Sequence, residues 1–85
     1  MKVYAYDKEG RTFSKEVSID NTSKAGPIID FGWPCRYYIE DIMRNPPEVG
    51  GRICIYAAGR NHKLSPVYID WTKELIDLLM ENSNA

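Results

Sequence analysis

The sequence lacks the features that usually reveal a membrane segment, a metal site or a disulfide framework. Its apolar runs fall far short of the roughly 20 residues that a membrane-spanning helix needs, and its first residues contain no apolar signal-peptide stretch. A single histidine, His62, and two cysteines, Cys35 and Cys54, make no recognisable set of metal ligands. We therefore expect no membrane span, no metal or other cofactor, and two reduced thiols in a cytoplasmic protein.

An excess of charge of either sign is also missing. Eleven basic and twelve acidic residues give a formal net charge of −1, so bulk charge makes no case for nucleic acid or a membrane as partner. Hydrophobic residues make up 44% of the chain and charged residues 27%, which is typical of globular proteins. We predict a single α+β domain over residues 1–85 with a thin core, whose tail, residues 82–85, frays.

Alternating apolar residues predict a β-hairpin at the start of the chain. Its strands are residues 2–6 and 12–19, and Gly10 closes the turn between them in a left-handed conformation. Lys15 interrupts the apolar face of the second strand, and a charge at such a position is typical of a sheet edge.

A helix is expected in the middle of the chain. The sequence leaves open whether residues 28–31 form a strand or an irregular segment. From Pro34, a favourable first helical residue, apolar side chains recur at helical spacing until Pro46 and Pro47 end the pattern. This predicts a helix over 34–44. Its buried stripe would contain Cys35, Tyr38, Ile39, Ile42 and Met43.

The C-terminal part predicts a strand followed by a helix. Residues 52–58 are almost continuously apolar, which indicates a central strand covered on both faces. The last helix has two possible starts. Either Ser65 caps it and Pro66 is its first residue, or Asp70 caps it and residues 67–69 form a strand. The helical phase of the apolar residues favours the longer helix.

These elements predict an α+β fold with the order β-hairpin, helix, strand, helix. The simplest arrangement is a small antiparallel or mixed sheet with two helices packed on one face. Six aliphatic residues are expected in the core, namely Ile39, Ile42, Ile53, Ile55, Leu75 and Leu79.

The cysteines give a weak indication of catalysis. Residues 54–60 (CIYAAGR) resemble the phosphate-binding loop of tyrosine phosphatases, in which a cysteine thiolate attacks phosphorus and an arginine holds the phosphate oxygens. The resemblance would make Cys54 the nucleophile and Arg60 the phosphate ligand. Cys35 would sit at a helix N-terminus, which favours a thiolate, but it also belongs to the buried stripe. We interpret both thiols as structural and mostly protected, and keep a cysteine-based enzyme as the third hypothesis.

Charge and aromatic patterning favour a binding protein over an enzyme. Residues 64–85 contain one basic and four acidic residues, and the four acids fall in one arc of the predicted helix. Such an arc suits a partner with a basic surface. Exposed aromatic residues are also favoured at interfaces. We predict a non-enzymatic protein-interaction module, regulatory or inhibitory in role. Its docking residues would be Trp33, Tyr37, Asp70, Glu74, Asp77 and Glu81.

The alternative hypothesis is a single-stranded nucleic-acid binder. Two tyrosines share one face of the first predicted strand, where their rings can stack on bases, and nearby cations can contact phosphates. The residues of this alternative are Tyr4, Tyr6, Arg52, Arg60 and Lys63. Nucleic acid is less favoured than a protein partner, and the sequence also allows a homodimer.

Overall fold

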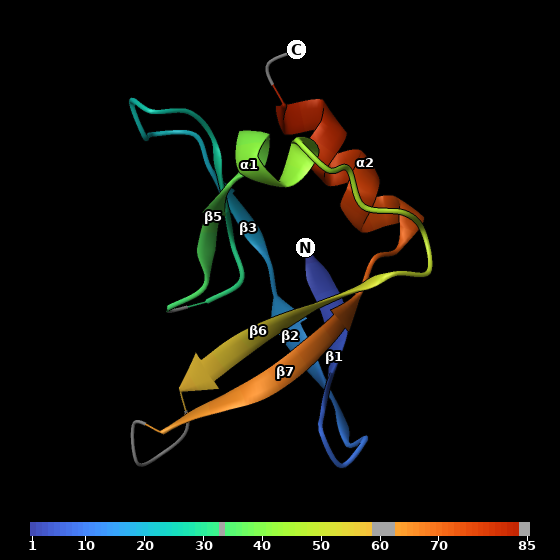
Figure 1. Cartoon of the computed structure of the whole chain (residues 1–85). Coiled ribbons are helices and arrows are strands. Elements are labelled where there is room, and N and C mark those ends of the chain that lie inside the picture. Colours follow the sequence, from blue (N-terminus) through green and yellow to red (C-terminus); the bar gives the residue numbers. More distant parts are fainter. Residues whose placement is uncertain (33, 59–62, 84–85) are drawn as a thin grey trace.

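A computed structural model describes residues 1–32, 34–58 and 63–83, which are built mainly from β-strands (Figure 1). Within these residues, seven strands form two antiparallel sheets, one of order β2-β1-β7-β6 and one of order β3-β4-β5. The strands are β1 (Lys2–Asp7), β2 (Thr12–Glu16), β3 (Ser18–Asp20), β4 (Ile28–Asp30), β5 (Arg36–Tyr38), β6 (Arg52–Ala58) and β7 (Leu64–Asp70). The helices are α1 (Ile39–Met43) and α2 (Lys73–Asn82). The predicted fold, with two helices on one face of a single sheet, is therefore wrong.

The N-terminal hairpin forms as predicted, but its second strand is divided. Gly10 has φ 83° in the turn between β1 and β2, as the turn requires. The predicted strand 12–19 breaks at Val17 into β2 and β3, which belong to different sheets. The Val17 side chain is fully buried, and its N–H donates to the carbonyl of Met1 at 2.8 Å. The chain passes from one sheet to the other here, so both sheets contribute to the same core. β2 is an edge strand, as Lys15 indicated.

The predicted helix over 34–44 is wrong. Its first part is β5, which pairs with β4, and only Ile39–Met43 is helical. A tight reversal before β5 allows this pairing. Gly32 has φ 96°, and its carbonyl accepts a hydrogen bond from the Cys35 N–H at 2.7 Å. The open question about 28–31 is answered by β4. Pairing with β4 thus overrides the helical spacing of the apolar residues.

The longer version of the last helix is also wrong. β7 pairs with β6 along its whole length, and α2 begins at Lys73. Its cap is Thr72, whose hydroxyl accepts a hydrogen bond from the Leu75 N–H at 3.2 Å. Pro66 is tolerated in β7 because no partner needs an N–H at this position. The Tyr56 N–H opposite it points out of the strand pair to a sulfur atom, and on the other side β1 pairs only with Val67, Tyr68 and Ile69.

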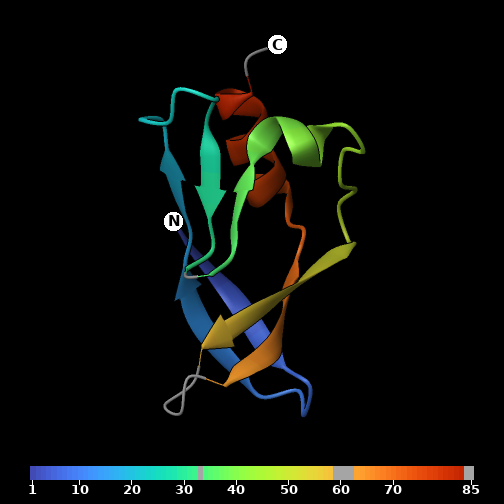
Figure 2. The same cartoon turned by 60° about the vertical axis from the view of Figure 1, so that its left-hand side comes forward.

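β6 has the predicted bounds but not the predicted environment. It was expected in the middle of a sheet with both faces covered, whereas it is an edge strand with one exposed face. Both helices lie at one end of the molecule, and the hairpins β1–β2 and β6–β7 extend to the other end (Figures 1 and 2). The helices therefore leave the outer face of these hairpins open.

The core lies between the inner face of the four-stranded sheet, the three-stranded sheet and the helices. The four-stranded sheet contributes Val3, Ala5, Ile55, Val67 and Ile69. The rest of the molecule contributes Val17, Ile29, Phe31, Cys35, Ile39, Trp71, Leu75 and Leu79. Four of the six predicted core residues are in this set, and the other two, Ile42 and Ile53, are partly buried against it.

Candidate functional site

The four acidic residues of the predicted docking surface do not share one helix face. Glu74, Asp77 and Glu81 belong to α2, whereas Asp70 is the last residue of β7. Asp77 accepts a hydrogen bond from Lys73 at 2.9 Å, and this contact raises the pKa of Lys73. The stripe on α2 is therefore one residue shorter than predicted and partly neutralised within the chain.

Tyr37, the described aromatic residue of that predicted surface, is already packed within the chain. Tyr37 lies in β5, half-buried, with its ring edge-on to Phe31 at a centroid separation of 6.0 Å. Burial raises the pKa of the Tyr37 phenol to about 12. A ring already packed in this way offers a partner little new area to bury. Trp33 lies outside the described residues.

A different surface, on the outer face of the four-stranded sheet, carries four tyrosines, two of which are exposed. Residues directly opposite one another in neighbouring strands point to the same face of a sheet. By this rule Tyr6, Tyr68 and Cys54 form one row across three strands, on the face opposite the buried residues. We call this surface the tyrosine face. It comprises Tyr4, Tyr6, Arg52, Cys54, Tyr56, Ala58, Leu64, Pro66, Tyr68 and Asp70.

Tyr6 and Tyr68 form the centre of the tyrosine face. Their rings are stacked, with centroids 5.6 Å apart and planes inclined by 27°. The Tyr6 hydroxyl donates to Oδ1 of Asp70 at 2.9 Å, and the Arg52 guanidinium lies 5.0 Å from the Tyr68 ring centroid. Nη1 of Arg52 also donates to the Tyr6 oxygen at 3.4 Å, which raises the pKa of Arg52. These contacts order two rings and two charged groups in the unbound chain.

Around this centre, large side chains are exposed. Tyr4 is 79% exposed, Tyr56 51% and Leu64 51%. An antiparallel sheet with one face in water normally carries polar side chains on that face. Here Tyr4, Tyr56 and Leu64 are exposed on it as well, and exposed aromatic and aliphatic groups are typical of binding surfaces.

The tyrosine face combines residues from both predicted surfaces. Tyr4, Tyr6 and Arg52 come from the nucleic-acid alternative, and Asp70 comes from the acidic stripe. A hollow of about 370 Å³ beside Tyr4 is lined by Asp70 and also by Glu74. Of the two remaining cations of the alternative surface, Lys63 is exposed just before β7 and Arg60 lies outside the described residues.

The sequence interpretation missed Tyr56, Tyr68 and Leu64. Tyr68 falls within the longer of the two predicted helices, and Tyr56 falls within the strand that was expected to be covered on both faces. The sequence signal lies in residues 66–70, where Val67 and Ile69, both buried in the structure, alternate with Pro66, Tyr68 and Asp70. This period of two is typical of a strand with one open face.

The two thiols lie in different environments, and the prediction that both are protected is wrong for Cys54. Cys35 is 6% exposed. Its Sγ accepts a hydrogen bond from the Tyr56 N–H and donates to the Tyr56 carbonyl, both at 3.3 Å. Cys54 is exposed on the tyrosine face, and both thiols are free.

The resemblance to a phosphatase loop is not supported by the position of Cys54. This residue and those up to Ala58 form part of β6, a regular strand paired with β7, and not a loop whose amides converge on an anion. Arg60 lies outside the described residues.

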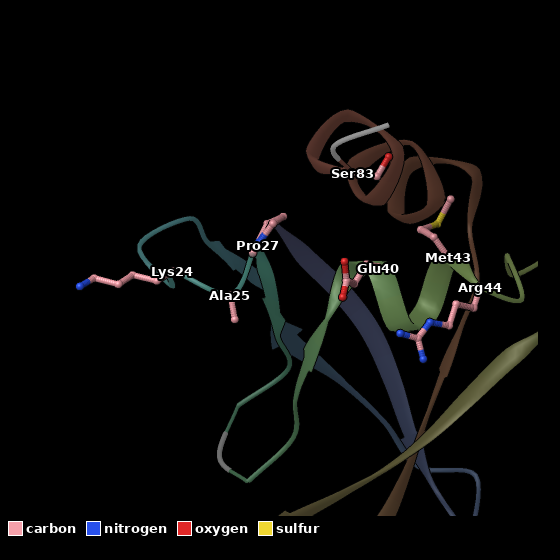
Figure 3. Close-up of a pocket in the computed structure, with 8 residues that line it drawn as sticks. Lys24, Ala25, Pro27, Glu40, Met43, Arg44 and Ser83 are labelled. Atoms are coloured by element: carbon pink, nitrogen blue, oxygen red, sulfur yellow. The ribbon is translucent and has the colours of Figure 1, made fainter.

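A larger hollow, of about 500 Å³, lies at the end of the molecule that carries the helices (Figure 3). Its lining residues are Lys24, Ala25, Gly26, Pro27, Glu40, Met43, Arg44 and Ser83. In Figure 3 the Lys24 side chain extends away from the other labelled residues. The described lining has one serine and no histidine or cysteine, so it assembles no recognisable catalytic set.

Comparisons with family models, curated proteins and solved structures found no match to this chain. Among residues 1–32, 34–58 and 63–83, no three histidine, cysteine, aspartate or glutamate side chains come together as metal ligands. None of the described helices is long and apolar enough to cross a membrane.

Proposed function

We propose that this chain is a non-enzymatic protein-interaction module that binds a partner on the tyrosine face. The observation that carries the proposal is the ordered pair Tyr6–Tyr68 flanked by the exposed rings of Tyr4 and Tyr56. Tyrosine buries a large area at a low cost in conformational entropy, and tyrosine and arginine are enriched in interface hot spots. A regulatory or inhibitory protein would act by covering a partner's surface in this way.

The central residues of the tyrosine face are already held in place, so binding would cost them little conformational entropy. Tyr6 is held by Asp70, and Arg52 is held against the Tyr68 ring. Side chains that are immobilised before binding lose less freedom when a partner arrives.

The free thiols of both cysteines support the prediction of a cytoplasmic location.

The charge of the tyrosine face favours protein over single-stranded nucleic acid as the partner. Arg52 and Asp70 are its charged members, and their charges cancel. A surface that follows a phosphate backbone needs an excess of cations along its length. Nucleic-acid binding therefore remains the second candidate, supported by the stacked tyrosines alone.

The test begins with capture of a partner from the native host on the immobilised chain, identified by mass spectrometry. Binding kinetics are then compared for the native chain, Tyr4→Ser, Tyr56→Ser and the control Met80→Ser. Met80 is 57% exposed on α2, outside the tyrosine face. We expect each tyrosine variant to speed dissociation by about tenfold or more, and the control to leave it unchanged.

A parallel titration with fluorescent single-stranded DNA and RNA tests the second candidate. Tight binding that weakens steeply with salt and is lost in Arg52→Gln would replace the proposal with nucleic-acid binding. Unchanged partner kinetics in both tyrosine variants would also overturn it.

A further inference from the structure

Resting on the proposed function, we infer that the tyrosine face also binds a second copy of the chain through the hairpin β6–β7. The two copies meet face to face about a two-fold axis that runs along the strands, between β6 and β7. Each β6 then lies over β7 of the other copy. Such an interface is isologous, so every contact occurs twice.

The register of β6 and β7 makes this arrangement self-complementary. Under the two-fold axis, each residue lies over its own cross-strand neighbour in the second copy. The resulting pairs are Arg52 over Asp70, Cys54 over Tyr68, Tyr56 over Pro66, and Ala58 over Leu64. The first pair joins opposite charges. The second and fourth pairs set a small side chain against a large one, and the third sets an aromatic ring against a proline ring. No row brings two like charges or two bulky aliphatic groups together.

The charged row supports a second copy most directly. Arg52 and Asp70 are directly opposite in register, yet within the described residues they form no ion pair with each other. The guanidinium is turned toward Tyr68, and Oδ1 of Asp70 accepts from Tyr6. Oδ2 of Asp70 has no hydrogen bond among the described residues, so it can accept from Arg52 of the second copy. The two-fold axis makes two equivalent ion pairs of this kind.

Strand addition at the sheet edges is less favourable than contact through the face. At the β6 edge, the Cys35 sulfur already binds both the N–H and the carbonyl of Tyr56. At the other edge, Lys15 lies opposite Val3 and so points to the inner side of the sheet, an arrangement that discourages edge pairing. The open part of the four-stranded sheet is therefore its outer face.

The contact area predicts a weak dimer. Two strands of seven residues present a face of about 10 by 23 Å. This is well below the roughly 800 Å² that each partner buries in a standard interface. We expect a dissociation constant between about 10 µM and 1 mM. The second copy would then occupy the tyrosine face at high concentration and give way to a tighter partner.

The test is a charge-reversal series in sedimentation equilibrium. The native chain should show reversible dimerisation below about 1 mM. Arg52→Asp puts two acidic groups in each charged row, and Asp70→Arg puts two arginines there, so each variant alone should dimerise at least about threefold more weakly. An equimolar mixture of the two should regain native association, because the heterodimer pairs acids with arginines. Glu81→Lys, a reversal on α2 outside the face, is the control and should change nothing.

The double variant Arg52→Asp/Asp70→Arg should also regain the dimer, which separates loss of the ion pairs from a folding defect. A native chain that stays monomeric at about 1 mM, or a mixture that fails to associate, overturns the inference. If partner binding still depends on Tyr4 and Tyr56 in that case, the proposed function stands alone. The charge-reversal variants can change dimerisation as expected while the Tyr4 and Tyr56 variants leave partner binding unchanged. This result would support the inference and overturn the proposed function.

Discussion

The two faces of the four-stranded sheet are made from the same strands, yet only one of them is covered. On β1, for example, Ala5 is fully buried, whereas the preceding residue Tyr4 is 79% exposed. The buried residues of the inner face are aliphatic and share one core with the second sheet and α2. The outer face carries Tyr4, Tyr6, Tyr56 and Tyr68 beside polar residues, and Tyr4 and Tyr56 are exposed. The difference shows that outer-face aromatics are not needed to fill the core, so their presence needs another explanation, and binding supplies one.

The largest expected effect is on the inner side. Leu75 of α2 is fully buried in the core, so Leu75→Ala should lower the free energy of unfolding by about 2–5 kcal/mol. For a chain of 85 residues, whose total stability is about 4–13 kcal/mol, this is a severe loss. Urea denaturation measures it. Met80→Ala, exposed on the same helix, is the control and should change stability by no more than about 0.5 kcal/mol. Equal losses in the two variants would show that α2 does not cover the sheet as described.

The helical phase of Leu75 could be predicted from the sequence, although the start of its helix could not. Apolar residues keep the same spacing whether the helix begins at Pro66 or at Lys73, so Leu75 and Leu79 are buried in either case. The error at residues 64–70 arises because Pro66 is also a favourable first helical residue. Residues 64–70 form a strand because they pair with β6, and this pairing is not a property of the local sequence.

A smaller effect is expected where the inner core meets the edge of β6. Cys35→Ala removes the sulfur that binds both backbone groups of Tyr56, so these groups lose their partner inside the protein. The expected loss of stability is about 1–3 kcal/mol. Hydrogen exchange at the Tyr56 amide should also become faster. Cys54→Ala, on the outer face, is the matched control, and an equally large loss there would contradict the assignment of that face as open.

The third prediction uses the two thiols as probes of the two sides of the sheet. Iodoacetamide at neutral pH should label Cys54 of the native chain rapidly and Cys35 only after denaturation, because a buried thiol is inert. Labelling at Cys54 should leave the melting temperature almost unchanged, since the added group points into solvent. Mass spectrometry of peptides identifies the labelled residue. Fast native labelling of Cys35 would show that the β6 edge opens readily.

The candidate site shows why local patterns predict less about function than about the core. Tyr4 and Tyr6 could be placed on one strand face from the sequence, because a strand alternates with a period of two. Their association with Tyr68 and Asp70 depends on the pairing of β1 with β7, two strands near opposite ends of the chain. The spacing of residues within either strand does not reveal which residues of β1 and β7 lie opposite one another. The acidic arc was wrong in one member for a related reason, because Asp70 belongs to a strand and not to the helix that follows it.

The smallest expected effect on stability sharpens the comparison of the two faces. Tyr4→Ser removes a side chain that contributes little buried area, so the free energy of unfolding should change by no more than about 0.5 kcal/mol. Val3→Ala, at the preceding position on the inner face, should lower the free energy of unfolding clearly more, because Val3 is 9% exposed and packs in the core. Urea denaturation of both variants gives the comparison. A loss for Tyr4→Ser as large as that for Val3→Ala would mean that the outer ring stabilises the fold. A negligible loss, together with faster dissociation of a partner, would mean that this exposed tyrosine serves binding and not folding.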